Sequence, residues 1–168
     1  MADGIFLFIS GFAGTGKTTL VHECAPMFPE YLFQDFDELF FTGPDGEWGI
    51  ENSPAGFLFM QQRIDTFIQT QEKPIVLAGV NMLGSTLNAQ YQVVLDTPLW
   101  QVVRNLWQRA RDAGKLSGMY KGEKRWRCVL GGYYAWKIRR HLVRNGFIRM
   151  TRQQIINFLV VKLPREGV

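Results

Sequence analysis

The stretch Gly11-Phe12-Ala13-Gly14-Thr15-Gly16-Lys17-Thr18 decides the fold of this 168-residue chain. The continuous apolar run from Ile5 to Ile9 precedes it and predicts a strand that is buried on both faces of a sheet. Residues from Lys17 to about Cys24 are predicted to form a helix, which ends before Pro26. A glycine-rich turn between a buried strand and a helix is typical of an α/β protein.

The same stretch fits the pattern G-x-x-x-x-G-K-[ST] at every fixed position. Its glycines allow a backbone path on which successive N–H groups point at phosphate oxygens, and the following helix adds its positive N-terminal end. Lys17 is expected to reach the β- and γ-phosphates, and Thr18 offers a hydroxyl group to Mg²⁺. The residues expected to bind the nucleotide are Gly11, Ala13, Gly14, Thr15, Gly16, Lys17, Thr18 and Thr19.

Strands and helices alternate along the rest of the chain. Apolar runs predict further strands at 31–35, 74–79, 92–96 and 147–150, and helical periodicity predicts helices at 55–71, 99–111, 129–143 and 151–163. This alternation predicts an α/β fold with a parallel sheet that helices cover on both faces. No linker divides the chain, so residues 1–168 are expected to form a single domain.

Acidic residues follow the predicted second strand. Asp35 and Asp37 are expected near the phosphate-binding loop, because ligands of open α/β sheets lie beyond the carboxyl ends of the strands. Asp35 is the candidate that orients the acceptor hydroxyl group, and Asp37 is a candidate for acceptor or metal binding. The third strand ends at Gly79, a substrate-binding candidate, without the acid typical of motor ATPases.

The region from 109 to 127 is rich in basic residues and is expected to form a lid. Arg109 and Arg111 end the predicted fourth helix and are the arginines expected to act in catalysis. Residues 112–126 carry three glycines among lysines and arginines, which predicts a mobile loop. The alternative interpretation is an ordinary exposed basic loop.

Charge and composition limit the partners. The net charge of +4 and the pI of about 9.2 favour anionic ligands, either nucleotides or nucleic acid. Four of the five tryptophans lie in or beside the basic second half, which also raises the possibility of nucleic-acid binding. Cys24 and Cys128 have no metal-ligand spacing, and no run is long enough to span a membrane, so a cytoplasmic protein is expected.

These features together resemble those of the small P-loop kinases, the group that contains nucleoside, nucleotide, shikimate and gluconate kinases. The resemblance rests on residues 11–18, Asp35-x-Asp37, Gly79, and Asp96-Thr97-Pro98 leading into a helix that ends in Arg109-x-Arg111. It implies a five-stranded parallel core, an acid after strand two that contacts acceptor or magnesium, and an arginine-bearing lid. Gly79 is followed by Val80-Asn81, in place of the glycine run of shikimate kinases.

The leading hypothesis is therefore an ATP-dependent kinase that uses Mg²⁺ and acts on a nucleoside, a nucleotide or a similar small hydroxyl or phosphate acceptor. Two alternatives remain open: a 5′-hydroxyl polynucleotide kinase, and a nucleotide-dependent switch or binding protein. The sequence does not distinguish ATP from GTP and does not indicate the oligomeric state.

Overall fold

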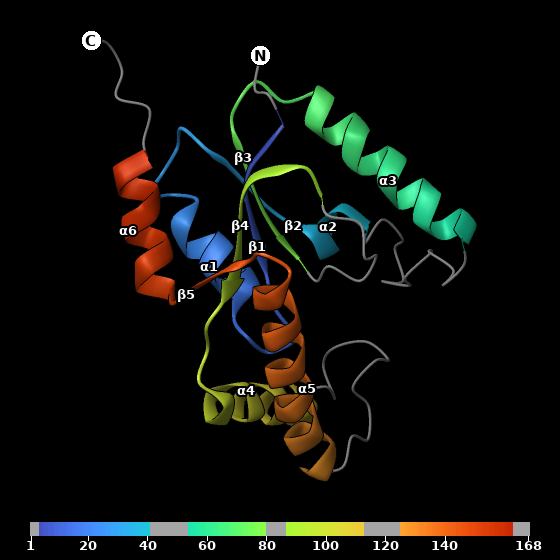
Figure 1. The fold of residues 1–168 in the computed structure, drawn as a ribbon, viewed down its shortest axis with the longest axis vertical. Coiled ribbons are helices and arrows are strands. Elements are labelled where there is room, and N and C mark those ends of the chain that lie inside the picture. The colour runs from blue at the N-terminus through green and yellow to red at the C-terminus, as the bar shows by residue number, and fades with distance from the viewer. Residues whose placement is uncertain (1–3, 41–53, 80–86, 113–124, 163–168) are drawn as a thin grey trace.

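The computed structural model describes residues 4–40, 54–79, 87–112 and 125–162 (Figure 1). Strands and helices alternate along these residues, as the sequence predicted. The strands are β1 (Ile5–Ser10), β2 (Leu32–Asp35), β3 (Ile75–Gly79), β4 (Ala89–Leu95) and β5 (Ile148–Met150). The helices are α1 (Lys17–Cys24), α2 (Phe36–Phe40), α3 (Pro54–Gln69), α4 (Leu99–Asp112), α5 (Arg125–Arg144) and α6 (Arg152–Lys162).

The five strands form one sheet in the order β2-β3-β1-β4-β5, and every pair is parallel. The predicted α/β fold class is thereby confirmed. The register aligns the carboxyl ends of the central strands, since Ser10 pairs with both Gly79 and Val94, and Asp35 pairs with Ala78. The segments that follow β1, β2 and β3 therefore begin at the same edge of the sheet, which is where ligands of such sheets bind.

Side chains alternate across β1 and build a core on each face of the sheet. Leu7 and Ile9 pack with α1 and α6 on one face, whereas Phe8 packs with α2, α3 and α5 on the other. Figure 1 shows α1 and α6 together on one side of the sheet and α3 and α5 on the opposite side. Because both faces are covered, β1 and β3 are apolar apart from Ser10 at the end of β1.

Helices α4 and α5 form a smaller third core beside the sheet. It contains Val102, Leu106, Cys128 and Ala135, and Phe12 of the glycine-rich loop packs against it. Glycine favours the close approach of the two helices, since a Cβ atom on Gly131 would lie 2.5 Å from Leu106 Cδ1 and would force the end of that side chain to move. The loop therefore packs against the pair of helices α4 and α5 through Phe12, in addition to its connection to the sheet.

Two expectations about local structure differ from the fold. Strand β2 ends at Asp35 and helix α2 begins at Phe36, a short helix that the sequence did not predict, so Asp37 lies in a helical turn and not on a continued strand. Helix α5 begins at Arg125, four residues earlier than predicted, because Arg125 and Arg127 interrupt the apolar residues of its first turn. Within the described part of the chain, no helix is long and apolar enough to cross a membrane.

Candidate phosphate-binding and catalytic site

The loop between β1 and α1 has the backbone conformation that its glycines permit. Gly14 and Gly16 have φ angles of 82° and 90°, in the left-handed region that other residues rarely adopt. A Cβ atom on Gly14 would also lie 3.0 Å from Leu106 Cγ of α4. The loop therefore needs glycine at 14 both for its turn and for its contact with α4.

Side chains of the protein itself satisfy four carbonyl groups of this loop. Lys17 Nζ donates to Gly11 O at 2.8 Å and to Phe12 O at 3.2 Å. From outside the loop, Asn105 Nδ2 donates to Gly14 O at 2.8 Å, and Thr97 Oγ1 donates to Thr15 O at 2.7 Å. These bonds fix the carbonyl groups, and the N–H groups of the loop are the natural donors for a bound phosphate.

Lys17 is the buried cation at the centre of the site. Its side chain lies at the start of α1, and burial lowers its pKa to about 8. The negative charges of Asp35 and Asp37 act in the opposite direction, and Arg109 lowers the pKa further. The two carboxylates do not fully offset the effect of burial on Lys17. A bound triphosphate would add negative charge beside its ammonium group, so phosphate binding should favour the protonated form of Lys17.

The two carboxylates after β2 lie in different surroundings. Asp35 is buried, and its Oδ1 accepts a hydrogen bond of 2.9 Å from the backbone N–H of Asp37. Asp37 is exposed at the surface of the protein. Partial desolvation by the surrounding protein nevertheless raises the pKa of its carboxyl group, and the negative charge of Asp35 raises that pKa further. Lys17 and Arg109 partly offset this effect, which means that all four groups interact electrostatically.

The two arginines predicted for catalysis differ in position. Arg109 is close enough to influence the pKa of both Lys17 and Asp37. Arg111 lies with Arg104, Trp107 and Gln108 around a separate surface pocket of about 210 Å³ on α4. Of these two residues, the structure thus brings Arg109 to the carboxylates and Lys17. The expected lid from 109 to 127 has its ends in α4 and α5, and residues 113–124 lie outside the described part of the chain.

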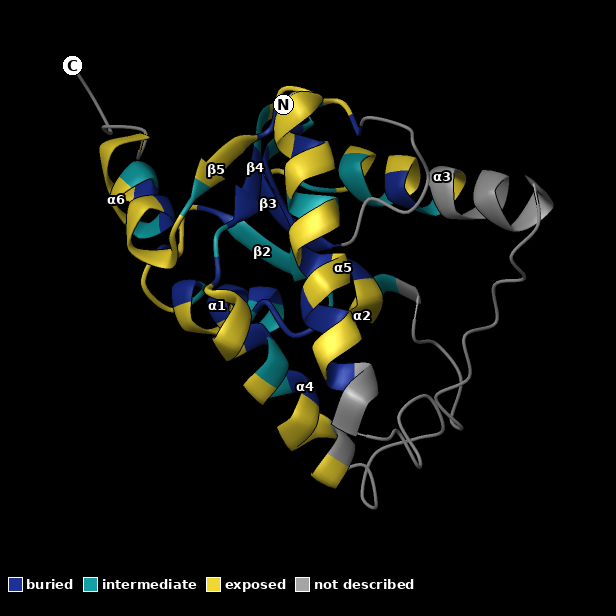
Figure 2. Cartoon of the chain, turned by 60° about the horizontal axis from the view of Figure 1, so that its bottom comes forward, coloured by how far each residue is buried: buried dark blue, intermediate teal, exposed yellow. Residues whose placement is uncertain are grey.

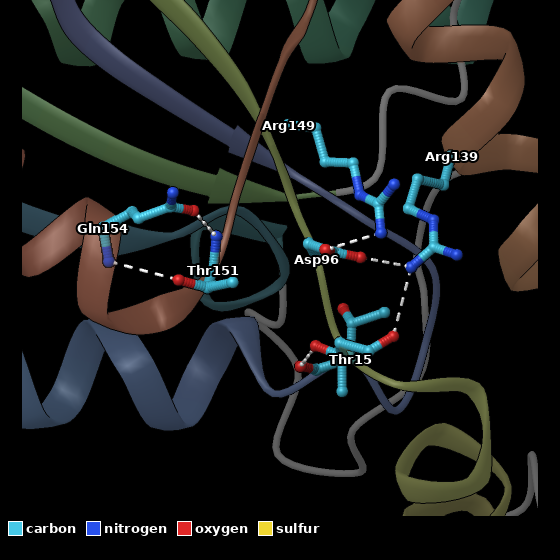
Figure 3. Close-up of polar contacts among 7 residues, drawn as sticks. Thr15, Asp96, Arg139, Arg149, Thr151 and Gln154 are labelled. Atoms are coloured by element: carbon cyan, nitrogen blue, oxygen red, sulfur yellow. Dashed lines mark hydrogen bonds and ion pairs between the residues drawn. The ribbon is translucent and has the colours of Figure 1, made fainter.

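An ion-pair network joins β4, β5 and α5 beside the loop (Figure 3). Asp96 pairs with Arg139 of α5, and its Oδ2 lies 2.8 Å from Arg149 Nη2 of β5. Arg139 also donates to Thr97 O at 3.3 Å, and Thr97 in turn holds the carbonyl group of Thr15. Helix α5 is therefore connected to the phosphate-binding loop through two adjacent residues that follow β4.

Two solved structures resemble this fold over almost their whole length. A shikimate kinase from Bacteroides thetaiotaomicron has a TM-score of 0.65 and 19% sequence identity, and the match covers 94% of this chain and 95% of that one. The chain has the fold of a small P-loop kinase. A shikimate kinase from Acinetobacter baumannii in complex with shikimate has a TM-score of 0.54 and 16% identity, covering 98% and 97%. No protein-family model and no curated protein matches the sequence.

The P-loop kinase fold makes Mg²⁺ the metal to test against the residues present. The donor set after β2 consists of the carboxylates of Asp35 and Asp37, and Thr18 follows Lys17 with a hydroxyl group. Oxygen ligands of this kind suit Mg²⁺, and a cation beside Asp37 would offset the negative charge of Asp35 that raises the pKa of Asp37. The residues therefore fit the metal, which would neutralise phosphate charge when bound.

Gly79 has a packing role at the end of β3. A Cβ atom on this residue would lie 2.6 Å from the Cβ atom of Phe36, the first residue of α2. The group that approaches Gly79 closely in the structure is thus Phe36, and this contact positions the helix that carries Asp37. The prediction that Gly79 also contacts substrate remains a prediction.

A pocket of about 440 Å³ adjoins the outer side of the P-loop, and the sequence interpretation missed most of its residues. Asn105 and Gln101 line it from α4, and Thr151 to Gln153 line it from the start of α6. These residues have ordinary polar side chains without a motif, so only the fold brings them together. Thr15, Gly16 and Thr19 of the predicted nucleotide-binding set lie on the same pocket.

Proposed function

We propose that this protein transfers the γ-phosphoryl group of ATP to a hydroxyl group of a small molecule. One arrangement carries the proposal: Asp35 ends β2 at the same edge of the sheet at which β1 runs into the phosphate-binding loop, and Asp35, Asp37 and Arg109 all lie near enough to Lys17 to affect its pKa. Phosphoryl transfer requires cations on the transferred group and a carboxylate for the attacking hydroxyl group. A cluster with both charges beside a phosphate-binding loop meets this requirement.

The residues have separate roles in this proposal. Lys17 and Arg109 stabilise the negative charge on the transferred group. Asp37, in place of the Asp35 that the sequence suggested for this role, accepts the proton of the acceptor hydroxyl group. Its surface position gives access to the acceptor, and its raised pKa makes it a stronger base than an ordinary aspartate. Asp35 is buried and holds the first turn of α2 through the N–H group of Asp37, so it orients that residue and contributes to the metal site.

The nucleoside part of ATP has a place beside the loop. The 440 Å³ pocket between α4 and the start of α6 adjoins Thr15 and Gly16, and its lining includes amide and hydroxyl side chains that can bind a base or ribose. Asp35 and Asp37 are not among the residues that line this pocket, so the acceptor can bind elsewhere.

A second pocket, of about 320 Å³, lies between α2 and α3 and is the candidate acceptor site. Leu39 lines it two residues after Asp37, and Gln62, Arg63, Thr66 and Phe67 line it from α3. This mixture of polar, cationic and apolar groups suits a small polar molecule. The neighbouring solved structures are shikimate kinases, which supports a small hydroxyl-bearing acceptor in preference to a polymer.

The experiment that tests the proposal measures ADP release from ATP and Mg²⁺ with and without candidate acceptors. The panel contains shikimate, sugar acids, nucleosides, nucleotides and 5′-hydroxyl oligonucleotides. A kinase releases ADP rapidly only with its acceptor, whereas a switch protein hydrolyses ATP slowly and independently of the panel. Lys17→Ala is the control for contaminating activity, and ADP release that does not depend on any acceptor contradicts the proposal.

A further inference from the structure

Helix α5 has an unusual charge for its length. Its 20 residues include six arginines or lysines and a histidine, and they contain no aspartate or glutamate. The chain as a whole has 19 basic and 15 acidic residues, so this helix holds a disproportionate share of the positive charge. The basic residues are Arg125, Arg127, Lys137, Arg139, Arg140 and Arg144.

The helix has a buried face and an exposed aromatic face. Cys128, Gly131, Gly132, Ala135 and Leu142 are buried against α4 and the sheet. On the outer side, Tyr133 and Tyr134 expose 54% and 50% of their surface, and Trp136 exposes 37%. Figure 2 shows exposed residues, in yellow, along α5. Large aromatic residues at this exposure are not needed for the core.

The aromatic rings are arranged as a small stack that also contains a cation. The rings of Tyr133 and Trp136 lie 6.0 Å apart at an angle of 30°, and Tyr134 contacts Tyr133 edge-on at 5.9 Å. The guanidinium group of Arg140 lies 5.4 Å from the centre of the Trp136 ring. These contacts restrain the rings at the surface, so less entropy is lost when a flat ligand stacks on them.

Helical spacing places cations beside these rings along one face. Tyr133, Lys137, Arg140 and Arg144 are separated by three or four residues and share the outer side of α5, where all four are exposed. Such a face offers flat apolar surfaces and positive charges in alternation, about one turn or 5.4 Å apart. Unpaired bases stack on aromatic rings, and the phosphates that link them bind lysine and arginine.

We propose that the outer face of α5, formed by Tyr133, Trp136, Lys137, Arg140 and Arg144, binds single-stranded nucleic acid. Charge complementarity selects an anionic polymer, and the exposed rings select one with unpaired bases. A duplex offers its phosphates but not the faces of its bases, and a membrane-binding helix needs a continuous apolar face, which the central cations of α5 interrupt.

None of the catalytic candidates belongs to the proposed surface. The catalytic candidates come from the loop after β1, the segment after β2, and α4, whereas Arg139 of α5 is paired with Asp96. Binding of nucleic acid to α5 is therefore independent of the proposed function, and each proposal can fail without the other.

Fluorescence anisotropy of the full chain with labelled 15-mer oligothymidine and oligouridine tests this proposal. We expect saturable binding that weakens steeply with salt, because phosphate contacts release counterions. A 15-base-pair duplex and inorganic polyphosphate of similar charge are expected to bind at least about tenfold more weakly, since neither offers unpaired bases. Equal affinity for polyphosphate or duplex would show that the surface binds negative charge without recognising unpaired bases, and this would overturn the proposal.

Variants on the outer face identify the contacts. Trp136→Ala and Tyr133→Ala should each weaken oligothymidine binding about tenfold, while Tyr133→Phe, which keeps the ring, should bind like the wild type. Trp100→Ala is the matched control, because Trp100 is an exposed tryptophan of α4, at 65% exposure, outside the proposed surface. Far-ultraviolet circular dichroism confirms that each variant is folded. Unchanged affinity in both alanine variants, or binding only to anionic lipid vesicles, would contradict the proposal.

Discussion

The hydroxyl group of Thr97, which follows β4, donates a 2.7 Å hydrogen bond to the carbonyl oxygen of Thr15 in the phosphate-binding loop. Both residues are buried, and 82 positions separate them in the chain. The bond fixes the loop from the side of β4, while Arg139 holds the backbone of Thr97 itself. The shape of the loop therefore depends on residues that no phosphate-binding motif contains.

Replacing Thr97 tests this dependence. Thr97→Val removes the donor and leaves the buried carbonyl group of Thr15 without it, so we expect the free energy of unfolding to fall by about 1–3 kcal/mol. Affinity for ADP should also fall, because the loop loses the hydrogen bond that fixes the carbonyl group of Thr15. Urea unfolding and titration with a fluorescent ADP analogue measure the two effects. Thr97→Ser retains the hydroxyl group, and a serine variant as defective as the valine variant would contradict this explanation.

The two arginines on Asp96 provide a matched pair. Arg139 is 18% exposed and Arg149 is 56% exposed, although both pair with the same carboxylate. Arg139→Met should destabilise the protein by roughly 1–3 kcal/mol, since it also removes the bond to Thr97 O. Arg149→Met should cost less than about 1 kcal/mol because water screens the exposed pair. Chemical unfolding of both variants is the measurement, and equal losses would show that burial does not decide the strength of these pairs.

Nucleotide binding should depend on pH through Lys17. Its pKa of about 8 lies below the ordinary value of 10.5, so the folded protein loses this proton in a range where the unfolded chain retains it. The unfolded state then binds more protons, and the contribution of Lys17 to unfolding free energy rises between about pH 8 and pH 10.5.

ADP affinity should move in the opposite direction, falling as the pH rises through about 8, because phosphate requires the ammonium form. Titration with a fluorescent ADP analogue from about pH 7 to about pH 9.5 measures the trend. Lys17→Arg stays charged over this range and should bind without the decline. A parallel decline in the arginine variant would assign the effect to another group.

Replacing Asp37 should stabilise the protein and lower its activity. Its raised pKa means that ionisation is less favourable in the folded protein than in the unfolded chain, so its carboxylate lowers stability once the pH exceeds the ordinary aspartate range. Asp37→Asn should therefore raise the Tm at pH 7 while lowering turnover by about 10²–10⁴-fold, the usual effect of losing a general base. Thermal unfolding and steady-state kinetics test the two effects, and a variant with normal turnover would remove Asp37 from the role of base.

Much of this organisation could be predicted because it is local in the sequence. The G-x-x-x-x-G-K-[ST] pattern, the apolar run of β1 and the start of α1 lie within 20 consecutive residues, and the structure confirms that they form a strand, a loop and a helix. Helix α4 was predicted from its apolar face, and Val102 and Leu106 are buried as expected.

The rest depends on contacts between distant residues. Asn105 and Thr97 have no distinctive spacing, and their bonds to the loop arise from the packing of α4 and the end of β4 around it. The short helix α2 was missed because Asp35-Phe36-Asp37 reads equally well as a strand end, and only the close contact of Phe36 with Gly79 favours the turn. The difference between Arg109 and Arg111 likewise follows from the side of α4 on which each side chain lies.

Transfer of labelled phosphate from ATP tests the central claim most directly. The wild-type protein is incubated with Mg²⁺, ATP that carries ³²P in the γ-position and a mixture of small hydroxyl-bearing metabolites, and the products are separated chromatographically. We predict a labelled small-molecule phosphate, formed in step with ADP, that Lys17→Ala fails to produce and Asp37→Asn produces far more slowly. Release of the label only as inorganic phosphate, or the same labelled product from Lys17→Ala, would contradict the proposed phosphotransfer.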